Sequence, residues 1–245
     1  MAPEFGAVQH SDSRGREVAQ SFHLSIGLCI MLIHPTLRMQ SWGFVIGSLL
    51  FALGSAPWIS PAMGAAAANT SFFVGSWFFT AAAFIQLVLS GAATTTDHGK
   101  PAIRAEWLSA AIQFLGTILF NISTGAALHA HTVEGEMHLV WNPNAEGSVA
   151  FLLSSALAVL MLVRANQLWE PGSKVWQSVW LNLLGSIAFG VSAVGAFITR
   201  NGTVMDDVLA NGGTFVGALC FFAASALFLG KPERPAVEEF VAATE

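Results

Sequence analysis

The chain is dominated by long apolar stretches that contain no Asp, Glu, Lys or Arg. Six such stretches lie at residues 42–59, 71–90, 107–128, 147–163, 175–198 and 208–229. A helix of about 20 apolar residues crosses the roughly 30 Å hydrocarbon core of a bilayer with its backbone groups paired internally. The stretches are continuously apolar rather than alternating apolar and polar, which favours helices over barrel strands. We therefore predict an all-α membrane protein with six transmembrane helices.

The basic residues predict the direction of these spans. Nine of the ten Lys and Arg fall on one side of the predicted membrane, and only Arg200 falls on the other. Positively charged flanks tend to remain in the cytoplasm. We therefore expect both termini to be cytoplasmic, with outer loops near residues 60–70, 129–146 and 199–207.

The two ends of the chain are expected to lie outside the spans. Residues 1–41 are predicted to be cytoplasmic, and within them residues 21–33 are apolar but too short to cross a bilayer, which indicates an interfacial helix. The alternative is a seventh span that starts earlier and places Arg14 and Arg16 outside. The tail at residues 230–245 mixes both charges with two prolines, a composition typical of disorder.

Composition agrees with a lipid-embedded chain and excludes several classes. Of the 245 residues 54% are hydrophobic and 10% are charged, whereas a soluble domain has about 25% charged residues. This excludes a water-soluble globule and a disordered chain, and a net charge of −5 offers no basic surface for nucleic acid. The expected partner is the lipid bilayer, with a homo-oligomer or an unidentified membrane partner as further alternatives.

A short pattern occurs once in every predicted span. It reads Gly, a small residue, two variable residues and Phe, and it pairs these residues: Gly47 with Phe51, Gly75 with Phe79, Gly116 with Phe120, Gly147 with Phe151, Gly185 with Phe189, and Gly217 with Phe221. The first glycines of successive units, at positions 47, 116 and 185, are each 69 residues apart. This periodicity predicts three tandem helical hairpins at residues 42–90, 107–163 and 175–229, arranged as parallel repeats because each crosses the membrane twice.

The pattern has a physical use in helix packing. Lipid is as apolar as the side chains, so membrane helices associate through small residues that let their backbones approach. Gly and Phe four residues apart lie on one helix face, which places a cleft one turn from a ring that can fill a neighbour's cleft. The hydroxyl that follows most of these glycines can donate to a carbonyl one turn back.

At these positions the chain resembles the YrhK-like domain family of small bacterial membrane domains, built from a helix pair with recurring Gly-Ser and Phe positions. The hairpins around Gly47 to Gly75 and around Gly185 to Gly217 are the most similar, and Ala218 departs from the hydroxyl. The resemblance implies the helix-pair architecture and a multi-pass location in the bacterial inner membrane. It implies no activity and no catalytic residues.

Four amides are the candidates for a polar path through the spans. They are Gln86, Gln113, Asn121 and Asn182, and Gln113 and Asn182 both lie three residues before a repeat glycine, where the first unit has Phe44. One interpretation is a passive channel or facilitator for a small neutral solute, and the other is hydrogen bonding between helices. Proton-coupled transport is disfavoured because the spans contain no charged residue.

The second outer loop carries a different candidate chemistry. His129, His131 and His138 lie there with Glu134 and Glu136, and imidazole with carboxylate is a usual ligand set for zinc or copper. A metal or pH sensor is therefore an alternative to a hydrated polar loop. The sequence otherwise predicts a non-enzymatic protein without a cofactor, because the loops are too short for an enzyme domain and no nucleotide or hydrolase motif is present.

Overall fold

The computed structural model describes residues 35–97, 100–130 and 132–230. Residues from Leu37 onward belong to one compact unit. The predicted interfacial helix at 21–33 lies outside the described residues, as do residues 231–245 of the predicted disordered tail.

The described chain is mostly helical. Its long helices are α2 (Leu37–Ser55), α4 (Ala65–Leu89), α5 (Ala105–Ala127), α7 (Asn142–Arg164), α8 (Lys174–Gly195) and α9 (Asp207–Ala226). The short elements are α3 (Ser60–Met63), α6 (Val133–Gly135) and the π-helix η1 (Glu136–Trp141), which runs directly into α7. Two short strands, β1 (Thr94–Asp97) and β2 (Lys100–Ile103), form an antiparallel hairpin.

Five helical segments of the described chain are long and apolar enough to cross a membrane. They are α4, α5, the continuous stretch Val133–Arg164, α8 and α9. The remaining predicted span, residues 42–59, overlaps α2, which is not among them. Its first turns contain Arg38, Gln40 and Ser41, and these polar residues lower its mean hydropathy.

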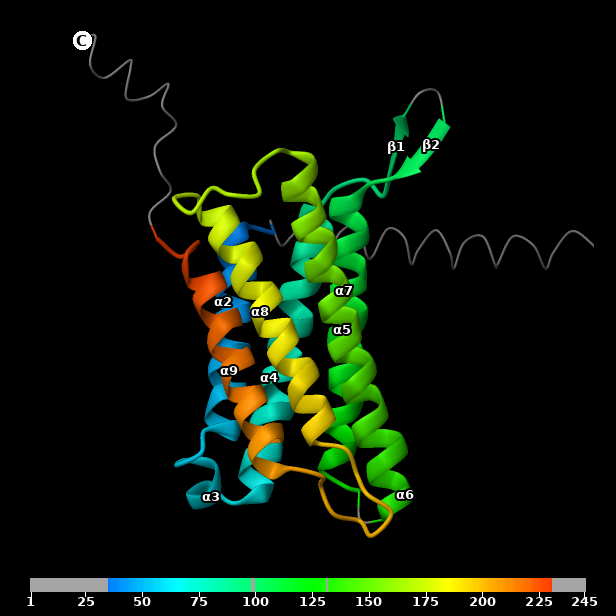
Figure 1. The fold of residues 1–245 in the computed structure, drawn as a ribbon, viewed down its shortest axis with the longest axis vertical. Helices are drawn as coiled ribbons and strands as arrows, with labels where there is room; N and C mark the ends of the chain where they lie inside the picture. Colours follow the sequence, from blue (N-terminus) through cyan, green and yellow to red (C-terminus); the bar gives the residue numbers. More distant parts are fainter. Residues whose placement is uncertain (1–34, 98–99, 131, 231–245) are drawn as a thin grey trace, which may run out of the picture. The chain divides into compact units, whose positions relative to one another are not determined.

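The six long helices pack side by side (Figure 1), and the contacts between them form a closed ring. Following the chain, each of them contacts the next, and α9 returns to contact α2. The most extensive contacts lie within the pairs α2 with α4, α5 with α7, and α8 with α9. Hydroxyl pairs also join helices of different pairs, because Ser76 bonds Thr124 at 3.1 Å and Ser155 bonds Ser186 at 2.8 Å.

The structure differs from the sequence prediction in the loops. The predicted outer loop 129–146 is helical from Val133 onward, and the loop near 60–70 contains α3 and the first turn of α4. Counting apolar residues detects only the part of a helix within hydrocarbon, whereas the backbone stays helical into the polar boundary. The β-hairpin was also not anticipated, because its strands have only four residues each and are too short to show a hydrophobic pattern.

Local sequence explains where several helices begin and end. The side chain of Asp206 accepts from the backbone N–H of Leu209 at 2.9 Å, which caps the first turn of α9. At the other end of a helix, Asn166 has a φ of 56° and follows α7. The N–H of Gln167 then bonds the carbonyl of Leu162 at 2.9 Å, which completes a Schellman motif.

In each helix pair, the repeat glycines lie against the repeat phenylalanines of the partner helix. A Cβ added to Gly116 would lie 2.7 Å from Cδ1 of Phe151, and one added to Gly147 would lie 3.1 Å from Cδ1 of Phe120. The same reciprocal contacts join Gly47 and Gly75 to Phe79 and Phe51, and Gly185 and Gly217 to Phe221 and Phe189. The missing Cβ atoms thus allow close backbone approach.

We predict that Gly116→Ala destabilises the fold by about 1–3 kcal/mol, because the new methyl group overlaps the buried Phe151 ring. The measurement is the denaturation midpoint of the purified protein in detergent. The matched control is Gly190→Ala on α8, where an added Cβ meets no atom within 4 Å. Equal midpoints for the two variants would show that the glycine faces are not tight contacts.

Candidate functional site

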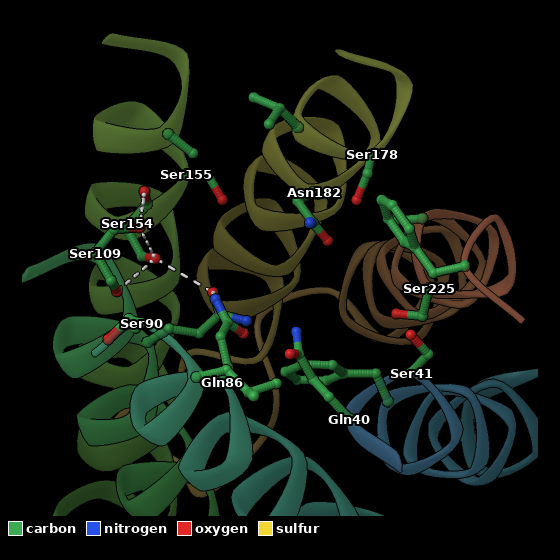
Figure 2. A pocket seen from close by; sticks show the side chains of 18 of the residues that line it. Gln40, Ser41, Gln86, Ser90, Ser109, Ser154, Ser155, Ser178, Asn182 and Ser225 are labelled. Carbon is green, nitrogen blue, oxygen red and sulfur yellow. Dashed lines mark hydrogen bonds between the residues drawn. The ribbon is translucent and has the colours of Figure 1, made fainter. Parts of the chain in front are cut away.

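A cavity of about 540 Å³ lies between the helices at the end where α2, α5 and α8 begin. Residues of all six long helices line it, and many carry amides or hydroxyls (Figure 2). The polar lining consists of Gln40, Ser41, Gln86, Ser90, Glu106, Ser109, Gln113, Ser154, Ser155, Ser178, Asn182 and Ser225. We refer to this space as the large cavity.

Several of these polar groups remain free to bind a solute. The Oε1 atom of Gln113 accepts from Ser154 Oγ at 3.3 Å and from Gln86 Nε2 at 3.5 Å, and the second contact is long for a hydrogen bond. The side chains of Gln40 and Asn182 make no hydrogen bond within the described part of the chain. The wall therefore presents donors and acceptors that a bound molecule can satisfy.

Three of the four amides selected from the sequence meet at this cavity, namely Gln86, Gln113 and Asn182. Phe44, which takes the equivalent repeat position in the first unit, also lines it. Asn121 lies elsewhere, between α5 and α4, where its Nδ2 donates to Thr80 Oγ1 at 2.8 Å. Asn121 therefore joins two helices, as in the alternative interpretation of the sequence.

The six repeat phenylalanines fill the centre of the ring. Each is at most 6% exposed. They form two triangles of rings in mutual contact, the first made of Phe51, Phe120 and Phe189 and the second of Phe79, Phe151 and Phe221. Ring centroids are 6.0–6.4 Å apart in the first triangle and 5.5–6.4 Å apart in the second. We call this cluster the phenylalanine seal.

The two triangles stack on each other through pairs of rings from the same hairpin. The three centroid separations, between Phe51 and Phe79, between Phe120 and Phe151 and between Phe189 and Phe221, are 5.3, 5.0 and 5.4 Å. Phe221 of the second triangle lines the large cavity. The seal therefore closes the axial end of that cavity with apolar rings.

A smaller cavity of about 200 Å³ lies on the opposite side of the seal, where α4, α7 and α9 begin. Phe51 of the first triangle lines it. Its polar lining comprises Asn69, Ser123, Thr124, Asn144, Ser192, Asn211 and Thr214. We refer to this space as the small cavity.

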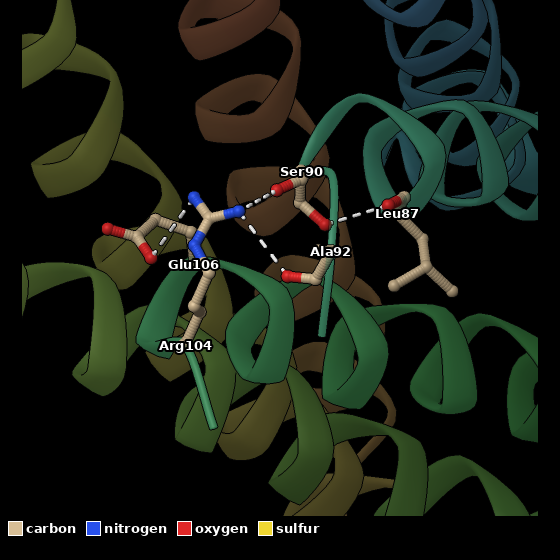
Figure 3. A network of polar contacts seen from close by, with 5 residues as sticks. All are labelled: Leu87, Ser90, Ala92, Arg104 and Glu106. Carbon is tan, nitrogen blue, oxygen red and sulfur yellow. Dashed lines mark hydrogen bonds and ion pairs between the residues drawn. The ribbon is translucent and has the colours of Figure 1, made fainter. Parts of the chain in front are cut away.

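The mouth of the large cavity carries an ion pair (Figure 3). Arg104 Nη2 lies 3.7 Å from Glu106 Oε2, and Arg104 Nη1 donates to the carbonyl of Ser90 at 2.9 Å. The cation therefore rests against the carbonyl end of α4, where the helix dipole favours it. Of the described residues that line the two cavities, Glu106 is the only one with an ionisable side chain of the Asp, Glu, Lys, Arg or His type. The walls are otherwise neutral.

The histidine candidates do not gather into a site. No group of three or more His, Cys, Asp or Glu among residues 35–97, 100–130 and 132–230 is arranged to hold a metal ion. His129 and His138 are exposed, and His138 Nδ1 lies 3.3 Å from Asn142 Nδ2. His131 lies outside the described residues.

The amides of the small cavity and Gln40 of the large cavity were not predicted from the sequence. Asn69, Asn144 and Asn211 precede the repeat glycine of the second helix in each hairpin, by six, three and six residues. That recurrence is a signal, but these residues lie at or beyond the ends of the apolar stretches.

Comparisons with known protein families, with curated proteins and with solved structures find no match to this chain.

Proposed function

We propose that this chain is a six-span membrane protein that lets small uncharged polar solutes pass along the axis of its helix ring. One observation carries the proposal: two polar cavities lie at opposite ends of the ring, and the phenylalanine seal separates them. In this proposal the structure is the closed form, and passage requires the rings of the seal to move apart. Hydrophobic constrictions of this kind gate pores by excluding water.

The walls favour a neutral solute. Amides and hydroxyls provide directional hydrogen bonds without charge, and the single carboxylate, Glu106, is paired with Arg104 at the mouth. Apart from Glu106 at the mouth, the cavity walls offer no charge that would stabilise a desolvated ion.

The repeated contacts support construction from three hairpins. Each pair of helices uses the same reciprocal Gly–Phe contact, and each hairpin contributes one ring to each triangle of the seal. The YrhK-like assignment stays a prediction that rests on the sequence pattern. In this proposal the first hairpin includes α2 as a sixth span.

The charge distribution supports an orientation with the large cavity toward the cytoplasm. Among the described residues, Arg38, Lys100, Arg104, Arg164 and Lys174 lie at the end that holds the large cavity. Arg200 alone lies at the other end. This asymmetry follows the rule for basic flanks.

The first test measures the entry of glycerol into liposomes that contain the purified protein. Light scattering after an osmotic step with glycerol reports the rate of entry. We expect Gln113→Leu and Asn182→Leu each to lower the protein-dependent rate by roughly tenfold, because each removes hydrogen bonds that a passing solute uses. Asn121→Leu, an amide outside both cavities, is the matched control and should retain the rate. If the protein does not speed the entry of any solute tested, the proposal is contradicted.

The second test addresses the seal. We expect Phe151→Ala to raise the rate of solute entry, because Phe151 contacts four other rings of the seal and its removal opens the axis. Since loss of a buried Phe costs about 3–5 kcal/mol of stability, Phe151→Leu serves as a milder second variant. Phe84→Ala, on an exposed position of α4, should leave the rate unchanged, and an equal increase there would argue against a specific gate.

The third test addresses orientation. In a background with Cys29→Ser and Cys220→Ala, cysteines are introduced singly by Gly172→Cys, between α7 and α8, and by Asn201→Cys, between α8 and α9. A membrane-impermeant maleimide added to intact cells should label the variant at 201 and label the variant at 172 only after permeabilisation. Labelling of both from outside would refute the proposed topology.

A further inference from the structure

The small cavity has the composition of a solute site in its own right. Each hairpin contributes one asparagine to it, namely Asn69 from α4, Asn144 from α7 and Asn211 from α9. None of its lining residues is Asp, Glu, Lys, Arg or His. The cavity is therefore a neutral amide-rich space, separate from the large cavity and on the other side of the seal.

The hydrogen bonds around the small cavity leave both amide acceptors and amide donors available. Asn69 Nδ2 donates to the carbonyl of Ala127 at 3.1 Å, and Asn211 Nδ2 donates to the carbonyl of Asp207 at 3.0 Å. These bonds fix the amide orientation, and they leave the Oδ1 and one N–H of each amide without a partner in the described chain. The hydroxyl of Ser123 already donates to the carbonyl of Val140 at 2.7 Å. Such a wall suits solutes that both donate and accept hydrogen bonds.

An irregular helix forms part of this wall. Val140 belongs to the π-helix η1, and Asn144 follows in the first turn of α7. Ser123 from α5 and the indole of Trp141, which donates to the carbonyl of Ala193 at 2.8 Å, hold this segment against two neighbouring helices. Single π-turns within α-helices occur frequently at functional sites. The position of η1 in this wall is therefore a second, independent indication that the cavity is functional.

The size of the small cavity limits what it can hold. At about 30 Å³ for each water molecule in the liquid, 200 Å³ corresponds to about seven waters. That is ample for a three-carbon polyol or a small amide such as urea, whereas a six-carbon polyol would fill the space completely. The large cavity, at about 540 Å³, imposes no such limit on these solutes.

We propose that the small cavity is a second solute site and that it sets the size limit for passage, admitting short polyols and small amides while excluding longer polyols. This inference rests on the proposed function, because it concerns solutes that travel the same axis. It assigns selectivity to the residues around Asn144 and Phe72 rather than to the seal or to the large cavity.

The experiment compares the entry of urea, glycerol, xylitol and mannitol into the same liposomes, each corrected for protein-free liposomes. We expect the protein-dependent rates for urea and glycerol to exceed that for mannitol by about tenfold or more, in the range that pockets achieve by size. Asn144→Leu should slow glycerol, whereas Asn142→Leu, a neighbouring amide outside both cavities, should not.

Two variants, each of which enlarges one of the cavities, show which cavity sets the size limit. Phe72→Ala removes a ring from the wall of the small cavity, and Met161→Ala removes a side chain from the wall of the large one. We expect Phe72→Ala to extend rapid entry to xylitol and Met161→Ala to leave the order of solutes unchanged. Circular dichroism and elution in detergent verify that both variants fold.

The outcomes separate this inference from the proposed function. Flux that does not decline with polyol length, or a limit shifted by Met161→Ala instead of Phe72→Ala, would overturn the second site and leave passage along the axis intact. Failure of every solute to enter, in the parent chain and in the Phe151→Ala variant, would overturn both. A limit that shifts only with Phe72→Ala supports the small cavity as the selective site.

Discussion

Close contact between helix backbones at the repeat glycines holds the helix pairs together. In lipid no hydrophobic gain draws two apolar helices together, so association relies on van der Waals contact and on hydrogen bonds. A glycine supplies that contact by removing the Cβ, and the partner's Phe ring fills the space. Any side chain larger than hydrogen at these positions would separate the helices and displace the ring.

The same contact also determines where the rings lie. Each Phe is held against a glycine of its hairpin partner, and the closed ring of helices then brings the six rings together on the axis in two stacked triangles. Packing and sealing are thus one arrangement rather than two. A movement that separates the seal must therefore also alter helix contacts, which links any opening to the bundle as a whole.

Polar side chains within apolar helices are tolerated here because they face enclosed space. An amide exposed to hydrocarbon costs free energy unless it is hydrogen-bonded, whereas Gln113 and Asn182 line a cavity among hydroxyls and other amides. Asn121 offsets part of the cost differently, because its Nδ2 donates to Thr80 on the neighbouring helix, although its Oδ1 is buried without a partner in the described chain. Three amides in similar helices thus have two different environments, and their positions along and around the helices decide which.

The long helices and their packing residues could be predicted from the sequence, because both depend on local pattern: continuous apolar stretches and a Gly-to-Phe spacing of one turn. Gln113 and Asn182 could also be selected, since their equivalent positions recur. Three features emerged only from the folded chain: the helices close into a ring, six phenylalanine side chains meet on its axis, and Asn69, Asn144 and Asn211 share a cavity. Those relations join residues far apart in the chain, and no local period specifies which helix lies beside which.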